Sequence, residues 1–167
     1  MTETPATAQS DTLLSAQLWA FALRCYAVEK EALLAFQETA DLHINDALFL
    51  AFSVEKNRIP DPVRWGQVRE GRPRRLLLRM RRYRQQMRRS HPGRSLALDW
   101  ELALERWDLE RLATCLAALP VPKYGAGLKR SEEVSGAAVA SLGEQSALGD
   151  AEARDLINRL VRGGQEG

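Results

Sequence analysis

The sequence is poor in the residue types from which catalytic and metal sites are usually built. Its 167 residues include two cysteines and two histidines, and His43 and His91 stand far apart. Neither a cluster of metal ligands nor a Ser/His/Asp arrangement is visible in this pattern. A glycine-rich phosphate-binding loop is also missing. We therefore expect no enzyme, no metal site and no cofactor.

Long hydrophobic runs and a leader segment are missing as well. The longest apolar runs, such as Ala47–Phe52, are far too short to cross a bilayer. The first eleven residues lack the positive region and apolar core of a signal peptide. Cys25 and Cys115 fall on apolar helix faces, where a thiol behaves as a small hydrophobic group. These features predict a protein of the reducing cytoplasm with no membrane anchor.

Alternating strand-like patterns do not occur, and the apolar residues recur at helical spacing instead. We expect an all-α domain over residues 10–120, a single compact bundle of about five helices. The first helix starts at the caps Ser10 and Asp11, and Asn45 caps a third. The predicted helices cover residues 12–26, 30–39, 46–56, 73–89 and 95–119.

From residue 121 the composition shifts to Gly, Ala, Ser and Glu, and aromatic residues become scarce. Two modest helices are possible, over residues 131–142 and 150–161. We expect residues 121–167 to form a tail that is weakly structured, partly helical or disordered.

What the sequence has in abundance is arginine in one place. Twelve arginines lie between Arg64 and Arg94, half of the chain's basic charge, and Glu70 is the only acid among them. The whole chain carries a net charge of only +2. Such a cluster either meets a polyanion or is neutralised by acids elsewhere in the fold. Both possibilities stay open at this point.

The arginine-rich helix and the next helix should form an antiparallel hairpin, because only a short turn around Gly93 separates them. This pairs the arginines with an acidic helix that carries a leucine stripe. Glu105 interrupts that stripe, so it needs a cationic partner, and we expect a buried pair with Arg82. Arg79 and Arg81 are alternatives. A third possibility places Glu105 in an internal ligand pocket.

The acids of the second helix are too few for twelve arginines, so some seven remain for solvent or for a partner. Arg81, Arg84, Arg88 and Arg89 are our candidates for contact with a partner or with phosphates. We expect a non-enzymatic helical adaptor that binds an unknown protein partner. The alternative is a nucleic-acid-associated protein whose arginines contact phosphates.

Aromatic residues at helical spacing are typical of a core. Trp100 and Trp107 lie beside the leucine stripe, and Tyr83 belongs to an apolar stripe in the arginine-rich helix. We therefore expect all three to be buried. The stripe with Tyr83 consists of Leu76, Met80, Tyr83 and Met87.

Four separated segments resemble a small family of conserved hypothetical proteins from Gram-negative bacteria. Leu18–Tyr26 is similar to its opening Leu/Phe-Trp-x-Phe-Ala-Leu-x-x-Tyr pattern. Leu34–Glu38 and Ile44–Leu50 are similar to the following Leu-x-x-Gln-Asp/Glu and Val/Ile-Asn-x-x-Leu-Phe patterns. Glu101–Arg106 resembles its Glu-Leu-x-x-Glu-Arg segment, which also follows an arginine-rich helix. The resemblance implies a bacterial cytoplasmic helical protein, and it brings no activity, cofactor or catalytic residue.

Overall fold

A computed structural model describes residues 5–117 and 127–165, and these residues contain seven helices and no strand. The expectation of an all-α fold is confirmed. The helices are α1 (Pro5–Thr39), α2 (Ile44–Glu55), α3 (Pro62–Arg69), α4 (Arg72–Gln86), α5 (Arg94–Ala117), α6 (Gly127–Gln145) and α7 (Asp150–Gln165). None of the described helices is long and apolar enough to cross a membrane.

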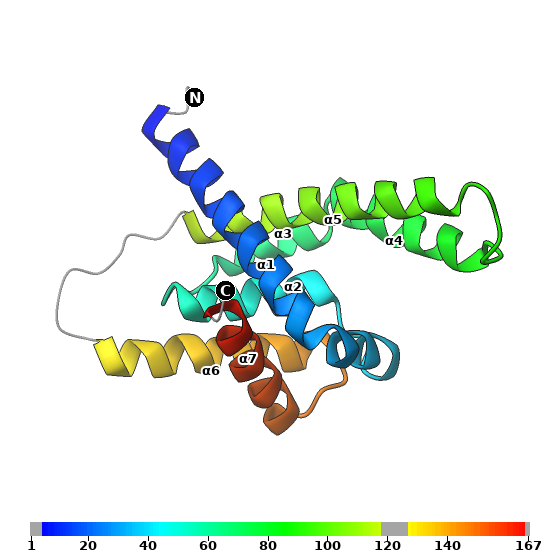
Figure 1. Ribbon diagram of the computed structural model, residues 1–167. Coiled ribbons are helices and arrows are strands. Elements are labelled where there is room, and N and C mark those ends of the chain that lie inside the picture. The colour runs from blue at the N-terminus through cyan, green and yellow to red at the C-terminus, as the bar shows by residue number, and fades with distance from the viewer. Residues whose placement is uncertain (1–4, 118–126, 166–167) are drawn as a thin grey trace.

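Helix α2 is the centre of the fold. Ten consecutive residues, Ile44–Ser53, are buried, so this helix has no face toward solvent over most of its length. Helices α1, α5, α6 and α7 all pack against it. Figure 1 shows α2 in the middle of the molecule, with α1 crossing on one side and α6 and α7 on another. A helix that is apolar on most sides is stable only when it is surrounded in this way.

Helix α1 is one continuous helix, where the sequence pattern predicted two. It begins at Pro5, before the predicted caps Ser10 and Asp11, and it runs without a break to Thr39. One side of it supplies fully buried residues such as Leu18, Phe21, Cys25 and Leu33 to the core. The predicted cap of α2 is also wrong, because His43 occupies that position and Asn45 lies inside the helix.

The two possible helices after residue 121 are present within α6 and α7, but the expectation that this region is weakly structured is wrong for both helices. Both helices belong to the same core as α1 and α2, through Ala138, Val139, Leu142, Leu156, Ile157 and Leu160. A side chain of α1 also holds the backbone of α7, since the Arg24 Nε donates a hydrogen bond of 2.8 Å to the Gly164 carbonyl. Small and aliphatic side chains are enough to hold α6 and α7 in the core, because these two helices pack directly against α2. The domain boundary predicted at residue 120 lies outside the described residues.

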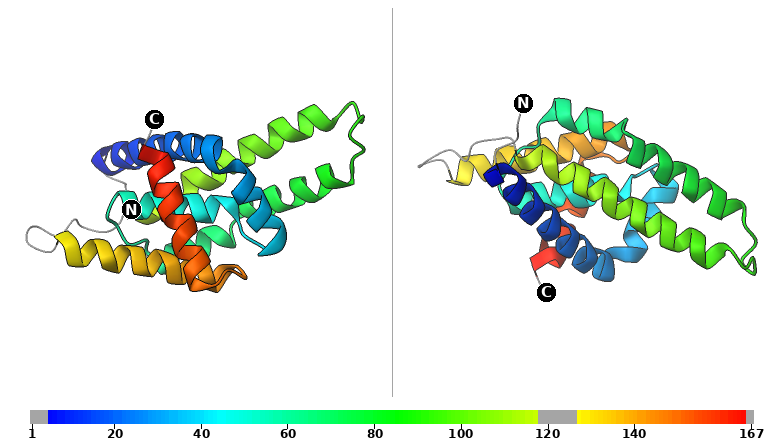
Figure 2. Two further views of the ribbon diagram at one scale, coloured as in Figure 1. Left: turned by 60° about the horizontal axis from the view of Figure 1, so that its bottom comes forward. Right: turned by 90° about the horizontal axis from the view of Figure 1, so that it is seen from above.

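The α4–α5 hairpin extends away from this core. Figure 1 shows the two helices side by side and projecting to the right of the other helices, and both views of Figure 2 show the same projection. Only the segments of α4 and α5 nearest to α1, α2 and α3 pack against the body of the molecule. The outer part of the hairpin is therefore held together by contacts between α4 and α5 themselves.

Candidate interaction surface

Helix α4 turns arginines, rather than its apolar stripe, toward α5. Its buried residues are Pro73, Arg74, Leu77 and Arg81. Pro73 lies in the first turn, as expected, where its missing N–H group has no helical partner to lose. The mean hydropathy of this helix is low. Its two buried arginines can face inward only because other helices supply acidic side chains to pair with them.

Arg74 is the centre of the first ion cluster, and it joins three helices. Its guanidinium donates two hydrogen bonds to Asp46 of α2, at 2.9 and 2.8 Å, and its Nε donates to both carboxylate oxygens of Asp108 on α5, at 3.0 and 3.1 Å. The Asn45 Nδ2 donates a further bond of 2.9 Å to Asp108. All four side chains are buried. The cluster therefore ties the base of the hairpin to α2.

The charges in this cluster hold each other in their ionised forms. Burial by itself raises the pKa of Asp46, but the hydrogen bonds and the positive charge of Arg74 outweigh burial and lower that pKa. Burial opposes the charge of Arg74 in the same way, and the two carboxylates nevertheless raise its pKa. Removing one partner would leave a buried charge unpaired, which costs about 3–5 kcal/mol.

A second cluster lies further along the hairpin. Arg81 donates to Glu101 at 3.3 Å and to Glu105 at 2.6 Å, and Arg84 makes two hydrogen bonds to Glu101. The expected pair of Glu105 with Arg82 is wrong, because Arg82 is exposed to solvent, and the alternative partner Arg81 faces α5 and binds Glu105 instead. Glu105 itself is only partly buried. The expected antiparallel pairing of the two helices through arginines and carboxylates is thus present.

These clusters decide which of the predicted contact residues can meet a partner. Arg81 and Arg84 are engaged with α5, whereas Arg88 and Arg89 are exposed and form no ion pair among the described residues. Seven of the twelve arginines have no ion pair within the part of the chain that the structure describes. They are Arg72, Arg75, Arg79, Arg82, Arg88, Arg89 and Arg94.

Four of these seven form a row on α4. Arg72, Arg75, Arg79 and Arg82 follow each other at spacings of three, four and three residues, and all four are exposed. Such spacing places them along one side of the helix. Arg94, in contrast, is used to close the turn, since its Nη1 donates to the carbonyl oxygens of Arg84 and Met87. We refer to the first four residues as the arginine row.

The hairpin also exposes an apolar face. Each apolar residue of this face directly precedes, in the sequence, a residue that faces the other helix. Trp100, for example, precedes Glu101, and Tyr83 precedes Arg84. Because α4 and α5 run antiparallel, these residues lie on the same side of the hairpin. This outer hairpin face consists of Leu76, Met80 and Tyr83 of α4 and Leu96, Trp100, Ala103 and Trp107 of α5.

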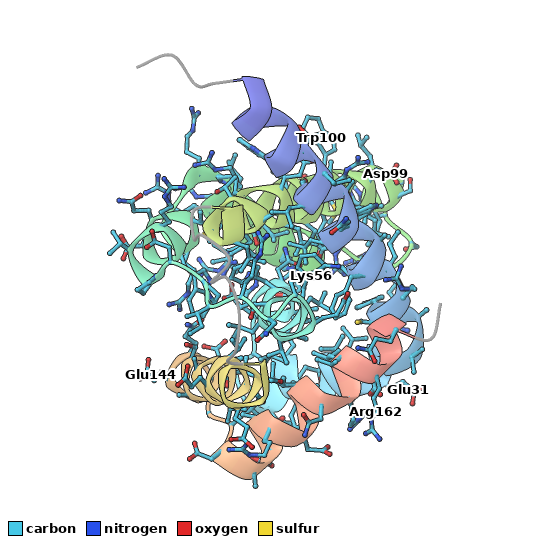
Figure 3. All side chains as sticks on the ribbon, turned by 90° about the vertical axis from the view of Figure 1, so that its left-hand side faces the viewer. Glu31, Lys56, Asp99, Trp100, Glu144 and Arg162 are labelled. Carbon is cyan, nitrogen blue, oxygen red and sulfur yellow. The ribbon has the colours of Figure 1, made fainter. Side chains whose placement is uncertain are left out.

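The expectation that the three aromatic residues are buried is wrong. Tyr83 and Trp100 are each 56% exposed, and Trp107 is 42% exposed. Figure 3 shows Trp100 and Asp99 on the opposite side of the molecule from Glu144 of α6 and Arg162 of α7. An exposed cluster of large apolar side chains is uncommon on a protein that acts alone, which makes this face a candidate interaction surface.

The ion pairs also determine which residues of the outer hairpin face are neighbours. Since Arg84 pairs with Glu101, Tyr83 lies level with Trp100. Since Arg74 pairs with Asp108, Leu76 lies level with Trp107. Ala103 lies between the two tryptophans and presents only a methyl group. The face therefore has two bulky ends and a low centre.

Other candidate sites are less developed. A cavity of about 290 Å³ lies between α3 and α6, next to Trp65, Arg69, Ser141 and Glu144. Glu105 does not line this cavity. In the described parts of the chain, no group of three or more His, Cys, Asp or Glu side chains could hold a metal ion.

The sequence pattern missed the first cluster completely. Asp46 and Asn45 stand in an apolar helix, and this is the one signal that could have indicated a buried polar partner. The partner's identity depends on the three-dimensional arrangement, since Arg74 and Asp108 come from two other helices. The helical spacing also singled out Tyr83, Trp100 and Trp107, but it predicted that these side chains are buried, whereas they are exposed.

Residues 17–112 match a protein family described as "Protein of unknown function (DUF2390)". The matched segment is more than half of the chain. The chain belongs to this family. The DUF2390 segment begins within α1 and ends within α5, so it contains both ion clusters and the outer hairpin face, while α6 and α7 lie beyond it. No curated protein and no solved structure matches the chain.

Proposed function

We propose that this DUF2390 protein is a non-enzymatic adaptor of the bacterial cytoplasm that binds a protein partner through the α4–α5 hairpin. The observation that carries this proposal is the exposure of Tyr83, Trp100 and Trp107 on one face of a hairpin that projects from the core. Tryptophan, tyrosine, methionine and arginine are enriched in the centres of protein–protein interfaces. All four residue types meet on or beside this face.

The ion clusters support this role because they make the hairpin a rigid support. Arg74 ties its base to α2, and Arg81 and Arg84 hold α4 and α5 together further out. The exposed side chains therefore belong to ordered helices with fixed register. A rigid face loses little conformational entropy when it binds, which favours affinity.

The arginine row favours nucleic acid as a second candidate. Four exposed arginines without ion pairs on one side of a helix suit a row of phosphate groups. This alternative predicts that binding falls steeply as the salt concentration rises. It also predicts that the outer hairpin face contributes little, except where rings stack on bases.

The proposal is tested by affinity capture from a bacterial lysate with the full chain as bait, with and without nuclease. We expect a discrete protein that survives nuclease treatment and that a Tyr83→Gln/Trp100→Gln double variant fails to retain. A variant with glutamine at all four positions of the arginine row distinguishes the second candidate. If only this variant loses its ligand, and nuclease removes that ligand from the wild type, the adaptor proposal is wrong and the nucleic-acid alternative holds.

The control for this experiment is a variant of similar chemistry far from the hairpin. Leu34 is 37% exposed on α1, so Leu34→Gln removes an exposed apolar side chain elsewhere. We expect it to retain the same protein as the wild type. All variants should give the helical circular dichroism spectrum of the wild type, because every substituted residue is exposed. Equal capture by wild type and Tyr83→Gln/Trp100→Gln would contradict the proposal.

A further inference from the structure

The outer hairpin face and the arginine row lie next to each other, and together they describe the chemistry of a partner. On α4, Arg72 and Arg79 lie beside Leu76 and Tyr83 around the helix axis, given the turn of about 100° per residue. The row therefore borders one long edge of the apolar face. A ligand that covers the apolar residues would also come within reach of these long, flexible arginine side chains.

We propose that the outer hairpin face binds an amphipathic helix of a partner protein, with carboxylates along the edge that meets the arginine row. This inference rests on the proposed function and names the kind of partner. Helices bind hydrophobic surfaces through apolar residues at positions i, i+3, i+4 and i+7. The low centre at Ala103, with Trp100 and Trp107 on either side, allows the partner helix its closest approach.

The positive charge of the arginine row is the reason to expect carboxylates on the partner helix. The arginines that face α5 already have acids, whereas the four of the arginine row have none among the described residues. Arginine forms its strongest hydrogen bonds with carboxylates, often with two parallel bonds. A partner with Asp or Glu along one edge would therefore supply to the outer side of α4 what α5 supplies to its inner side.

Two other occupants fit the surface less well. A second copy of this chain, bound symmetrically through the same face, would bring the arginines of both copies together. On α5 the only exposed acids near the face are Asp99, at its edge, and Glu110. Glu110 is already paired with Arg106. Nucleic acid would satisfy the arginines, but phosphates and sugars have no need of Leu76, Met80 and Leu96. The partner helix accounts for both parts of the surface.

The test is selection from a displayed library of random 20-residue peptides, with the full-length chain as target. We expect the enriched peptides to share large apolar residues at helical spacing and an excess of Asp and Glu. A synthetic peptide of the enriched sequence should bind the wild type. Its binding should weaken at least tenfold in Ala103→Arg, where a long charged side chain fills the low centre of the face.

Matched variants separate the apolar and the charged contributions. Ala140 is an exposed alanine on α6, and Ala140→Arg should leave peptide binding unchanged. Arg72→Gln/Arg79→Gln should weaken binding several-fold and make it less sensitive to salt. Ala103 and both arginines are exposed, so the fold should be the same in each variant. A circular dichroism melt checks this directly.

Several outcomes would overturn the inference. Peptides that show no excess of acids, or that bind Ala103→Arg as well as wild type, would show that the partner has a different chemistry or binds elsewhere. A fluorescent 20-nucleotide oligothymidylate that binds through the arginine row, with no peptide enriched, would identify nucleic acid instead. Sedimentation that shows a dimer lost in Ala103→Arg would identify a second copy. If the peptides fail while lysate capture still depends on Trp100, only this inference fails and the adaptor proposal stands.

Discussion

We expect His43 to make the folded protein less stable in mild acid. The ring precedes α2 and lies close to Arg74, and both of its nitrogens are buried without a hydrogen-bond partner. Burial first, and then the positive charge of Arg74, lower the pKa of His43 from 6.5 to about 3. The folded protein therefore keeps this ring neutral well below the pH at which the unfolded chain protonates it.

The sign of the effect follows from the order of the two pKa values. Between pH 6.5 and pH 3 the unfolded state binds a proton that the folded state excludes, so the stability falls as the pH falls. Each pH unit in that window costs about 1.4 kcal/mol. Lowering the pH from 7 to 4.5 should thus reduce the free energy of unfolding by about 2–3 kcal/mol through His43 alone.

The measurement is urea unfolding, followed by circular dichroism, at pH 7 and pH 4.5. His43→Phe is the comparison, because phenylalanine fills a similar volume and cannot be protonated. The variant should lose about 2–3 kcal/mol less than the wild type between the two pH values, whatever its stability at pH 7. Other titrating groups are common to both proteins and cancel in this difference. An equal loss of stability in wild type and variant would show that the folded protein does not exclude a proton from His43.

Three further predictions concern packing, register and the thiols. A Cβ atom at Gly164 would lie 1.9 Å from the ring of the fully buried Phe21, so Gly164→Ala should destabilise the fold by about 1–3 kcal/mol in chemical unfolding. At Gly163 the atom nearest to an added Cβ is 3.8 Å away, so Gly163→Ala should have no such cost and should stabilise α7 by about 0.5–1 kcal/mol. A Gly163→Ala variant less stable than Gly164→Ala would contradict the packing of α7 on α1. Arg81→Gln should cost at least about 1 kcal/mol in the same assay, while Arg82→Gln should stay within about 0.5 kcal/mol, and equal effects would contradict the register of the hairpin. Burial raises the pKa of the two cysteine thiols to about 12 and about 11, so a thiol-specific disulfide reagent at pH 8 should react with them only after unfolding in urea.

Apolar periodicity predicted most of the helices, but it gave the wrong buried face for α4 and for the outer part of α5, where Trp100 is exposed. In α4 the stripe with Tyr83 has the spacing of a buried face, yet Arg74 and Arg81 take the inward position. The reason is that the acids of α2 and α5 make burial of these arginines possible, and no periodicity within α4 carries that information. Burying Tyr83 instead would have left Glu101 and Asp108 facing apolar side chains.

The pairing of Glu105 was predicted to within one position, because the short turn limits how α4 and α5 can align. A helix turns about 100° per residue, so an error of one position moves a side chain from the interface to solvent. This is the difference between Arg81 and Arg82. The packing of α6 was missed for another reason: residues such as Ala138 and Val139 bury little area each, and their contribution depends on the close approach of α2.

The burial of α2 over most of its length has a consequence for the boundaries of the folding unit. The DUF2390 match ends at residue 112, yet α6 and α7 cover part of the surface of α2. A chain cut after α5 would expose those core residues to water, although every element of the family segment would still be present. The Ala147 N–H also donates a 2.8 Å hydrogen bond to the carbonyl of Ala40, so the C-terminal helices are joined to the loop that leads into α2. We therefore expect the folding unit of this protein to extend beyond the segment that defines its family.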